Sequence, residues 1–132
     1  MEFKTKTIRD AFEATNRNPD LLPDVSMLPE KDRHIIDYYN LTVVTEAINQ
    51  ESNGGKPWKP NYNDFNEKKW EIWFGIEADE KHPSGVGFSD SVTFCERTGT
   101  GVGSRLCFHS EEALRYAVKK FEKLYELVII QK

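Results

Sequence analysis

The sequence of 132 residues lacks long apolar runs and holds few of the residues that build cross-links or metal centres. A membrane-spanning helix needs about 20 consecutive apolar residues, and no stretch approaches that length. Two cysteines are too few for a disulfide framework, and three histidines without supporting spacing do not complete a zinc site. The sequence therefore predicts no membrane contact, no metal and no cofactor.

Positive charge is also scarce, with 18 basic against 22 acidic residues, a formal net charge of −4 and a pI near 5.4. This balance argues against a nucleic-acid binder that works through a general electrostatic field. No signal peptide opens the chain, and two cysteines without an export signal are typical of reduced thiols. We therefore expect a cytoplasmic protein.

At this length the chain is expected to form one domain, residues 1–132, that buries roughly two-thirds of the surface its unfolded state exposes. Residues 1–6 are predicted to be flexible. A short helix is predicted over 7–15, with Thr7 as its N-cap. Two longer helices are predicted over 29–50 and 110–128, because their apolar residues recur at helical spacing.

Three segments alternate apolar and polar residues with the period of a β-strand, at 70–77, 86–95 and 105–109. Turn-rich sequences separate them, which predicts two hairpins with one apolar face throughout. That register sets these residues opposite each other: Ile72 and Val92, Ile76 and Phe88, Cys95 and Cys107. The predicted fold is α+β, an antiparallel sheet of three or more strands packed against two main helices and a short N-terminal helix.

A long loop, 51–67, joins the first long helix to the sheet and carries both aromatic and basic side chains. Loops of this length are commonly functional or disordered, and the aromatic residues argue against disorder. Basic residues interleaved with rings suit single-stranded nucleic acid, since rings stack on bases and lysines meet phosphates. Trp73 is expected on the polar face of the sheet, beside Arg105, where it either contacts a ligand or lies under this loop. The candidate ligand-binding residues are Trp58, Lys59, Tyr62, Trp73, Asp90 and Arg105.

Asp90 interrupts the apolar face of the second strand, opposite Phe74 in the predicted register. A buried carboxylate there would mark a functional site, whereas a β-bulge would leave it in water. The polar face is expected to carry Cys107 and His109, which are the residue types of a nucleophile pair. Unreactive thiols are the competing interpretation, and no catalytic residue is assigned.

The end of the chain, 127–130, is apolar on all sides. A helix at the surface normally keeps one polar face. The segment therefore either docks on the core or forms a contact between copies of the chain, through Leu127, Ile129 and Ile130.

Four stretches carry a resemblance: LPDVSMLPEKDRHIIDYYNL, PWKP, WFGIEADEKHPSGVGFS and VGSRLCFHSEEALRYAVKKFEKLY. They are similar to a recurring family of small uncharacterised proteins encoded by gut anaerobes and their phages and prophages, from about Leu22 onward. The family brings no activity or catalytic residue that could be carried over. The resemblance implies a mobile-element product that works inside a bacterial host cell.

The leading expectation is a non-catalytic binding or accessory module of phage or prophage origin, acting on an unidentified protein partner. One alternative is a single-stranded nucleic-acid-binding protein. The other is a small enzyme built on Cys107, His109 and Asp90.

Overall fold

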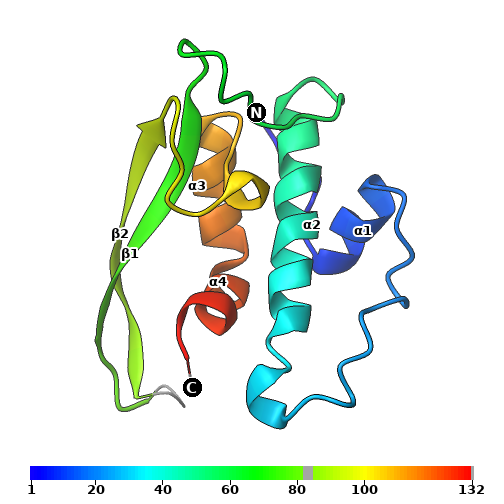
Figure 1. Ribbon diagram of the computed structural model, residues 1–132, viewed down its shortest axis with the longest axis vertical. Helices are drawn as coiled ribbons and strands as arrows, with labels where there is room; N and C mark the ends of the chain where they lie inside the picture. The colour runs from blue at the N-terminus through cyan, green and yellow to red at the C-terminus, as the bar shows by residue number, and fades with distance from the viewer. Residues whose placement is uncertain (82–84, 132) are drawn as a thin grey trace.

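The computed structural model describes residues 1–81 and 85–131, and the side chain of Asp90 lies outside this description. The elements in chain order are α1 (Ile8–Ala14), η1 (Glu30–Asp32), α2 (Ile35–Ser52), β1 (Lys69–Ala78), β2 (Val86–Glu96), η2 (Ser104–Leu106), α3 (Glu111–Lys120) and α4 (Glu122–Ile129), where η marks a 3-10 turn. The β1–β2 ribbon forms one side of the molecule, α3 and α4 lie between it and α2, and α1 packs on the far side of α2 (Figure 1). The predicted α+β class, with an antiparallel sheet packed against helices, is confirmed.

Local capping residues set the helix starts. The Thr7 hydroxyl accepts a hydrogen bond of 3.0 Å from the amide of Asp10, and the Asp10 carboxylate accepts one of 3.1 Å from the amide of Thr7. This reciprocal capping box satisfies amides that have no partner inside α1. Ser110 caps α3 in the same way, by accepting from the amide of Ala113 at 3.1 Å. The predicted final helix divides at Phe121, where the backbone leaves the helical region, and both halves pack against α2.

Residues 1–6 are anchored, which contradicts the predicted flexibility. Phe3 and Thr5 are buried. The Glu51 carboxylate of α2 accepts hydrogen bonds from the amide and the hydroxyl of Thr5 at 3.0 and 2.6 Å, and the Tyr116 hydroxyl donates to the carbonyl of Thr5 at 2.5 Å. The composition of the segment does not indicate this, because its partners are distant in the chain.

The β1–β2 pairing contains one irregularity. Ile76 pairs with Phe88, as predicted, whereas the preceding Gly75 pairs with Asp90. β2 therefore contains one more residue than β1 over this step, which defines a β-bulge. A bulge is one of the two interpretations proposed for Asp90 from the sequence, and the backbone confirms it.

The bulge reverses the faces of the second half of β2. Ile72 lies opposite Thr93 and not opposite Val92, which faces Trp73 instead. Because side chains alternate across a strand, Val92 and Phe94 share the outer face with Trp73. The outer face is the side of the sheet that carries Trp73, opposite the core side of Ile72. The predicted continuous apolar face is therefore wrong beyond the bulge.

The third predicted strand, 105–109, is reduced to one bridge. Phe108 and Trp70 exchange two backbone hydrogen bonds of 3.0 and 2.8 Å at the edge of β1. On the other side of the segment, Asn49 of α2 donates to the carbonyl before Phe108 and accepts from the amide after it, both at 2.8 Å. The Asn49 side chain thus occupies the backbone groups through which a further strand would pair. The residues just before the bridge form the 3-10 turn η2 and not a strand.

Cys95 and Cys107 are free thiols that do not face each other. Cys95 lies opposite Trp70, and Trp70 pairs on its other side with Phe108. Since β1 runs between the two cysteines, the predicted Cys95–Cys107 pairing is wrong.

Candidate ligand-binding groove

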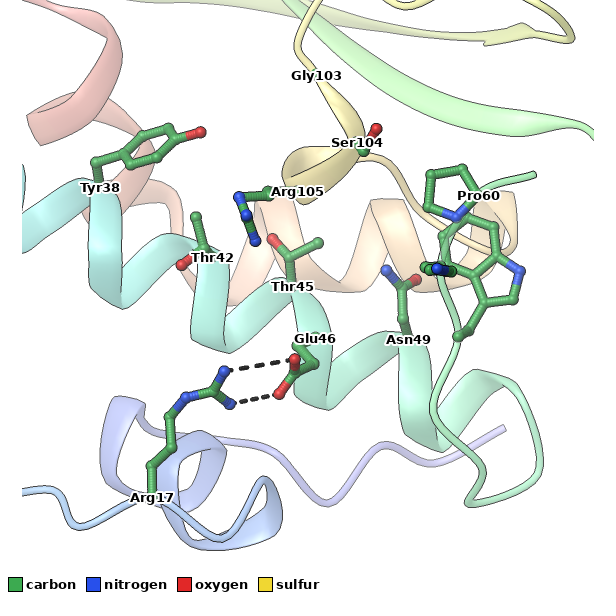
Figure 2. A pocket seen from close by; sticks show the side chains of 12 residues that line it. Arg17, Tyr38, Thr42, Thr45, Glu46, Asn49, Pro60, Gly103, Ser104 and Arg105 are labelled. Atoms are coloured by element: carbon green, nitrogen blue, oxygen red, sulfur yellow. Dashed lines mark hydrogen bonds and ion pairs between the residues drawn. The ribbon is translucent and has the colours of Figure 1, made fainter. Parts of the chain in front are cut away.

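A groove of about 510 Å³ runs along α2, between this helix, the turn η2 and the loop that follows α2 (Figure 2). This volume lies within the range of about 300–1,000 Å³ that is common for ligand sites in proteins. The lining residues are Arg17, Tyr38, Thr42, Thr45, Glu46, Asn49, Trp58, Lys59, Pro60, Gly103, Ser104 and Arg105.

One face of α2 forms the floor. Tyr38, Thr42, Thr45 and Asn49 recur at intervals of three or four residues, which places them on one side of a helix. The hydroxyls of Thr42 and Thr45 donate to carbonyls one turn earlier, at 2.7 and 2.8 Å. The floor is therefore polar, and Glu46 is its only charged residue.

Arg105 enters the groove from η2 and lies over Thr42 and Thr45 (Figure 2). Gly103 precedes η2 with a φ of +86°, a conformation that glycine adopts far more readily than other residues. Asn49 holds the segment just after η2 against α2 through its two hydrogen bonds. The position of Arg105 thus depends on a glycine before the turn and an α2 side chain after it.

Trp58 closes the groove near the C-terminal end of α2. Its ring packs edge-on against His109, with 5.6 Å between ring centroids. The His109 ring nitrogen Nδ1 lies 2.9 Å from the hydroxyl of Ser52, the last residue of α2. Asn53 donates to the carbonyl of Lys56 at 3.1 Å and so orders the start of the loop. These contacts fix the indole ring relative to the helix.

The groove concentrates positive charge on a chain whose net charge is −4. Arg17, Lys59 and Arg105 line it, against a single carboxylate, Glu46. The Arg17 guanidinium and the Glu46 carboxylate form an ion pair through two contacts, and this pairing raises the pKa of Arg17. Within the described residues, Lys59 and Arg105 make no ion pair.

Three of the six predicted ligand-binding residues, Trp58, Lys59 and Arg105, lie together in this groove. Tyr62 lies elsewhere: it is half-buried, and its hydroxyl is 3.4 Å from the Cys107 sulfur. The backbone of Asp90 lies at the bulge in β2, and its side chain lies outside the described residues.

Trp73 lies on the outer face of the sheet, opposite Val92, and 60% of its surface is exposed. The prediction that the loop 51–67 covers it is wrong. The prediction that Trp73 neighbours Arg105 is also wrong, because Arg105 belongs to η2 and lines the groove along α2.

The loops cover a different part of the outer face, around Cys107 and Glu71. Both are buried, and the Cys107 thiol donates to the Glu71 carboxylate at 3.2 Å. Glu71 also accepts from the Thr100 hydroxyl at 2.5 Å and from the amide of Gly101 at 3.0 Å. Burial raises the pKa of the Cys107 thiol to about 11. Since a nucleophilic thiol needs a lowered pKa, this setting favours a structural role.

Sequence reasoning missed Arg17, Tyr38 and Glu46 as groove residues. The polar stripe from Tyr38 to Asn49 repeats at helical spacing inside a largely buried helix, and this signal could have identified the floor. Arg17 follows α1 in a turn, and nothing in its neighbours indicates that it reaches α2.

The C-terminal apolar residues divide between core and surface. Ile130 is buried, so it is not available for the predicted contact between copies of the chain. Leu127 and Ile129 are exposed. Self-association through these two residues stays a prediction.

Within the part of the chain that the structure describes, no group of three His, Cys, Asp or Glu side chains could hold a metal ion. None of the described helices combines the length and the apolar character needed to cross a membrane. A scan against protein-family models and searches of curated proteins and of solved structures found no match.

Proposed function

We propose that the chain is a non-catalytic binding module, and that its ligand is an anion that occupies the groove along α2. The observation that carries this proposal is the convergence of Arg17, Lys59 and Arg105 on one groove that contains a single carboxylate. These cations come from three separate parts of the chain. Guanidinium groups bind carboxylates and phosphates through paired hydrogen bonds, and a lysine adds a point charge.

The Arg17–Glu46 pair supports the same ligand class. Arg17 meets a carboxylate through two contacts, which is the arrangement that arginine also uses for anionic ligands. A ligand anion therefore competes with Glu46 for Arg17. Lys59 and Arg105 are exposed and need not be released from an ion pair with another described residue.

The lining favours binding over chemistry. It contains neither cysteine nor histidine, and the Thr42 and Thr45 hydroxyls are engaged with helix carbonyls. The resemblance to small phage and prophage proteins adds a context, an accessory protein in the bacterial cytoplasm. That context is part of the proposal.

Isothermal titration calorimetry with inorganic pyrophosphate and with ATP, at low ionic strength, tests the proposal. Arg105→Gln is expected to weaken binding roughly tenfold or more, because one charge-assisted hydrogen bond contributes about 1.5–3 kcal/mol. Glu46→Gln is expected to tighten binding, because it frees Arg17. Lys119→Gln, on the exposed side of α3, is the matched control and should bind as the wild type does. No binding of either anion, or equal binding by Arg105→Gln, would contradict the proposal.

A further inference from the structure

Two aromatic side chains line the groove, at different ends of α2. Tyr38 lies in the first turn of the helix and is 40% exposed. Trp58 packs on His109, whose amide donates to Asn49 in the last part of the helix. From residue 38 to residue 49 an α-helix advances about 16 Å, at about 1.5 Å per residue. The two rings thus mark the two ends of one groove.

The cationic groups lie along the length between these ends. Figure 2 shows Arg105 on one side of the middle of the helix, the Arg17–Glu46 pair on the other side at a similar position along it, and Pro60 near Asn49. Lys59 adjoins Trp58 in the chain and lines the same groove. The order along α2 is therefore ring, cations, ring.

We infer that the anion bound in this groove is a short single-stranded nucleic acid, whose backbone follows α2 and whose bases stack on Tyr38 and Trp58. This inference rests on the proposed function, because it names the chemical class of the ligand of the same groove. Proteins that bind single strands combine a positive groove that tracks phosphates with rings on which bases stack. A strand of nucleotides offers both groups repeatedly along its length.

Other anions match the groove less completely. A free nucleotide has one base and cannot use rings at both ends of the groove. An acidic peptide can satisfy Arg17, Lys59 and Arg105 but gives no reason for a ring at each end of the groove. The outer face of the sheet has an exposed ring in Trp73, but the only basic residue in β1 and β2 is Lys69, which is buried and bound to loop carbonyls.

The charge of the chain sets the expected salt dependence. With a net charge of −4, the molecule as a whole does not attract phosphates, so the salt dependence is expected to come from the contacts in the groove. Three phosphate contacts to a single strand give a slope of log K against log salt of about −2. A shallow slope of this size is expected, and removal of one contact by Arg105→Gln should reduce its magnitude by about 0.7.

Fluorescence anisotropy with labelled oligothymidylates tests the inference. An oligomer of about six nucleotides should bind more tightly than a dinucleotide or thymidine monophosphate, because only the oligomer reaches both rings. Trp58→Ala and Tyr38→Ala should each lower the affinity for the oligomer about fivefold or more. Trp73→Ala is the matched control and should leave affinity unchanged. Thermal melts monitored by circular dichroism verify folding, and the exposed position of Tyr38 keeps its variant informative if Trp58→Ala unfolds.

The outcomes separate this inference from the proposed function. If the monophosphate and the oligomer bind with equal affinity, and Arg105→Gln abolishes the binding of both, the single-strand inference is overturned. The proposal of an anion-binding groove is then retained. Tighter binding of an oligoglutamate peptide than of the oligomer also overturns it and identifies an acidic protein partner. Absence of binding by every anion overturns both.

Discussion

At the scale of single residues, two tyrosines of the helical layer differ in whether the hydroxyl has a partner. The Tyr116 hydroxyl donates to the carbonyl of Thr5 at 2.5 Å. The Tyr125 hydroxyl is buried and has no hydrogen-bond partner within the described residues. Its burial also raises the pKa of Tyr125. An unpaired polar group inside a protein costs about 1–3 kcal/mol, so Tyr125 is a local weakness of the core.

We predict that Tyr125→Phe raises the free energy of unfolding by about 1 kcal/mol, because it removes the unpaired hydroxyl and keeps the ring. Tyr116→Phe is the matched variant and should lower the free energy of unfolding by about 1 kcal/mol. Urea denaturation measures both. A loss of stability in Tyr125→Phe would show that this hydroxyl has a partner in solution.

The Cys107 thiol predicts a dependence of stability on pH. Its pKa in the folded protein is about 11, above the ordinary value of 9.0. As pH rises, the unfolded state therefore loses this proton before the folded state does. The stabilisation that the Cys107 thiol gives the folded state is complete below about pH 9 and is lost as pH rises to about 11. Burial also raises the pKa of Tyr62, Tyr116 and Tyr125, so these tyrosines also lower the free energy of unfolding as the pH becomes alkaline.

A comparison with Cys107→Ser isolates the thiol. The serine hydroxyl keeps a donor for Glu71 and does not titrate in this range. We expect the free energy of unfolding, measured with urea under reducing conditions, to fall less between pH 9 and pH 11 in the variant than in the wild type. Identical profiles for the two proteins would show that the Cys107 pKa is not raised by folding.

At the scale of elements, the signals that predicted structure correctly are local ones. The Thr7 and Ser110 caps, the helical spacing of apolar residues and the alternation in β1 and β2 are all visible in short windows of sequence. The bulge is harder to predict, because an alternating pattern does not show which residue is extra. Asp90, where a polar residue falls in an apolar series, was its one indication.

Long-range contacts limited the rest of the prediction. The third strand stops at Phe108 because Asn49 binds the backbone on both sides of that residue, from 58 positions away. The groove was predicted in part, since Trp58, Lys59 and Arg105 are aromatic and basic residues of the kind that bind ligands, and all three line it. Arg17 could not be predicted, because its place in the groove depends on its ion pair with Glu46 across 29 positions.

Gly103 offers a test of how the chain positions Arg105. Its φ of +86° and ψ of 159° lie in a region that is essentially restricted to glycine. We predict that Gly103→Ala lowers the free energy of unfolding by about 1–3 kcal/mol and weakens anion binding, because η2 and Arg105 must shift. Gly99→Ala, in the same loop and without a positive φ, should change neither. Unchanged anion affinity in Gly103→Ala, measured by calorimetry, would show that the turn does not determine the position of Arg105.

At the scale of the whole molecule, the loops 53–68 and 97–107 pack over the same end of the sheet and supply the wall and roof of the groove. Lys69 joins them: its buried amine donates to the carbonyls of Asp64 and Glu67 in the first loop and of Arg97 in the second, at 3.0, 3.0 and 2.6 Å. A buried cation needs such partners, since a charge without them is costly. The sheet thus serves as the support on which both loops are placed.

This arrangement places Arg17, Lys59 and Arg105 in one recess of an acidic molecule. The net charge of −4 disfavours a general, non-specific attraction of anions to the surface. The account therefore depends on a single location for the ligand. Contacts elsewhere, for example around Trp73 and Val92 on the outer face, would require a different function.

The most direct measurement is a titration of the ¹⁵N-labelled protein with inorganic pyrophosphate, followed by ¹H–¹⁵N chemical-shift mapping at low ionic strength. The account predicts saturable shifts at the backbone amides of Arg17, Lys59, Ser104 and Arg105, with little change at Trp73 and Val92. Shifts that are confined to the outer face, or that do not saturate at any groove residue, would contradict it.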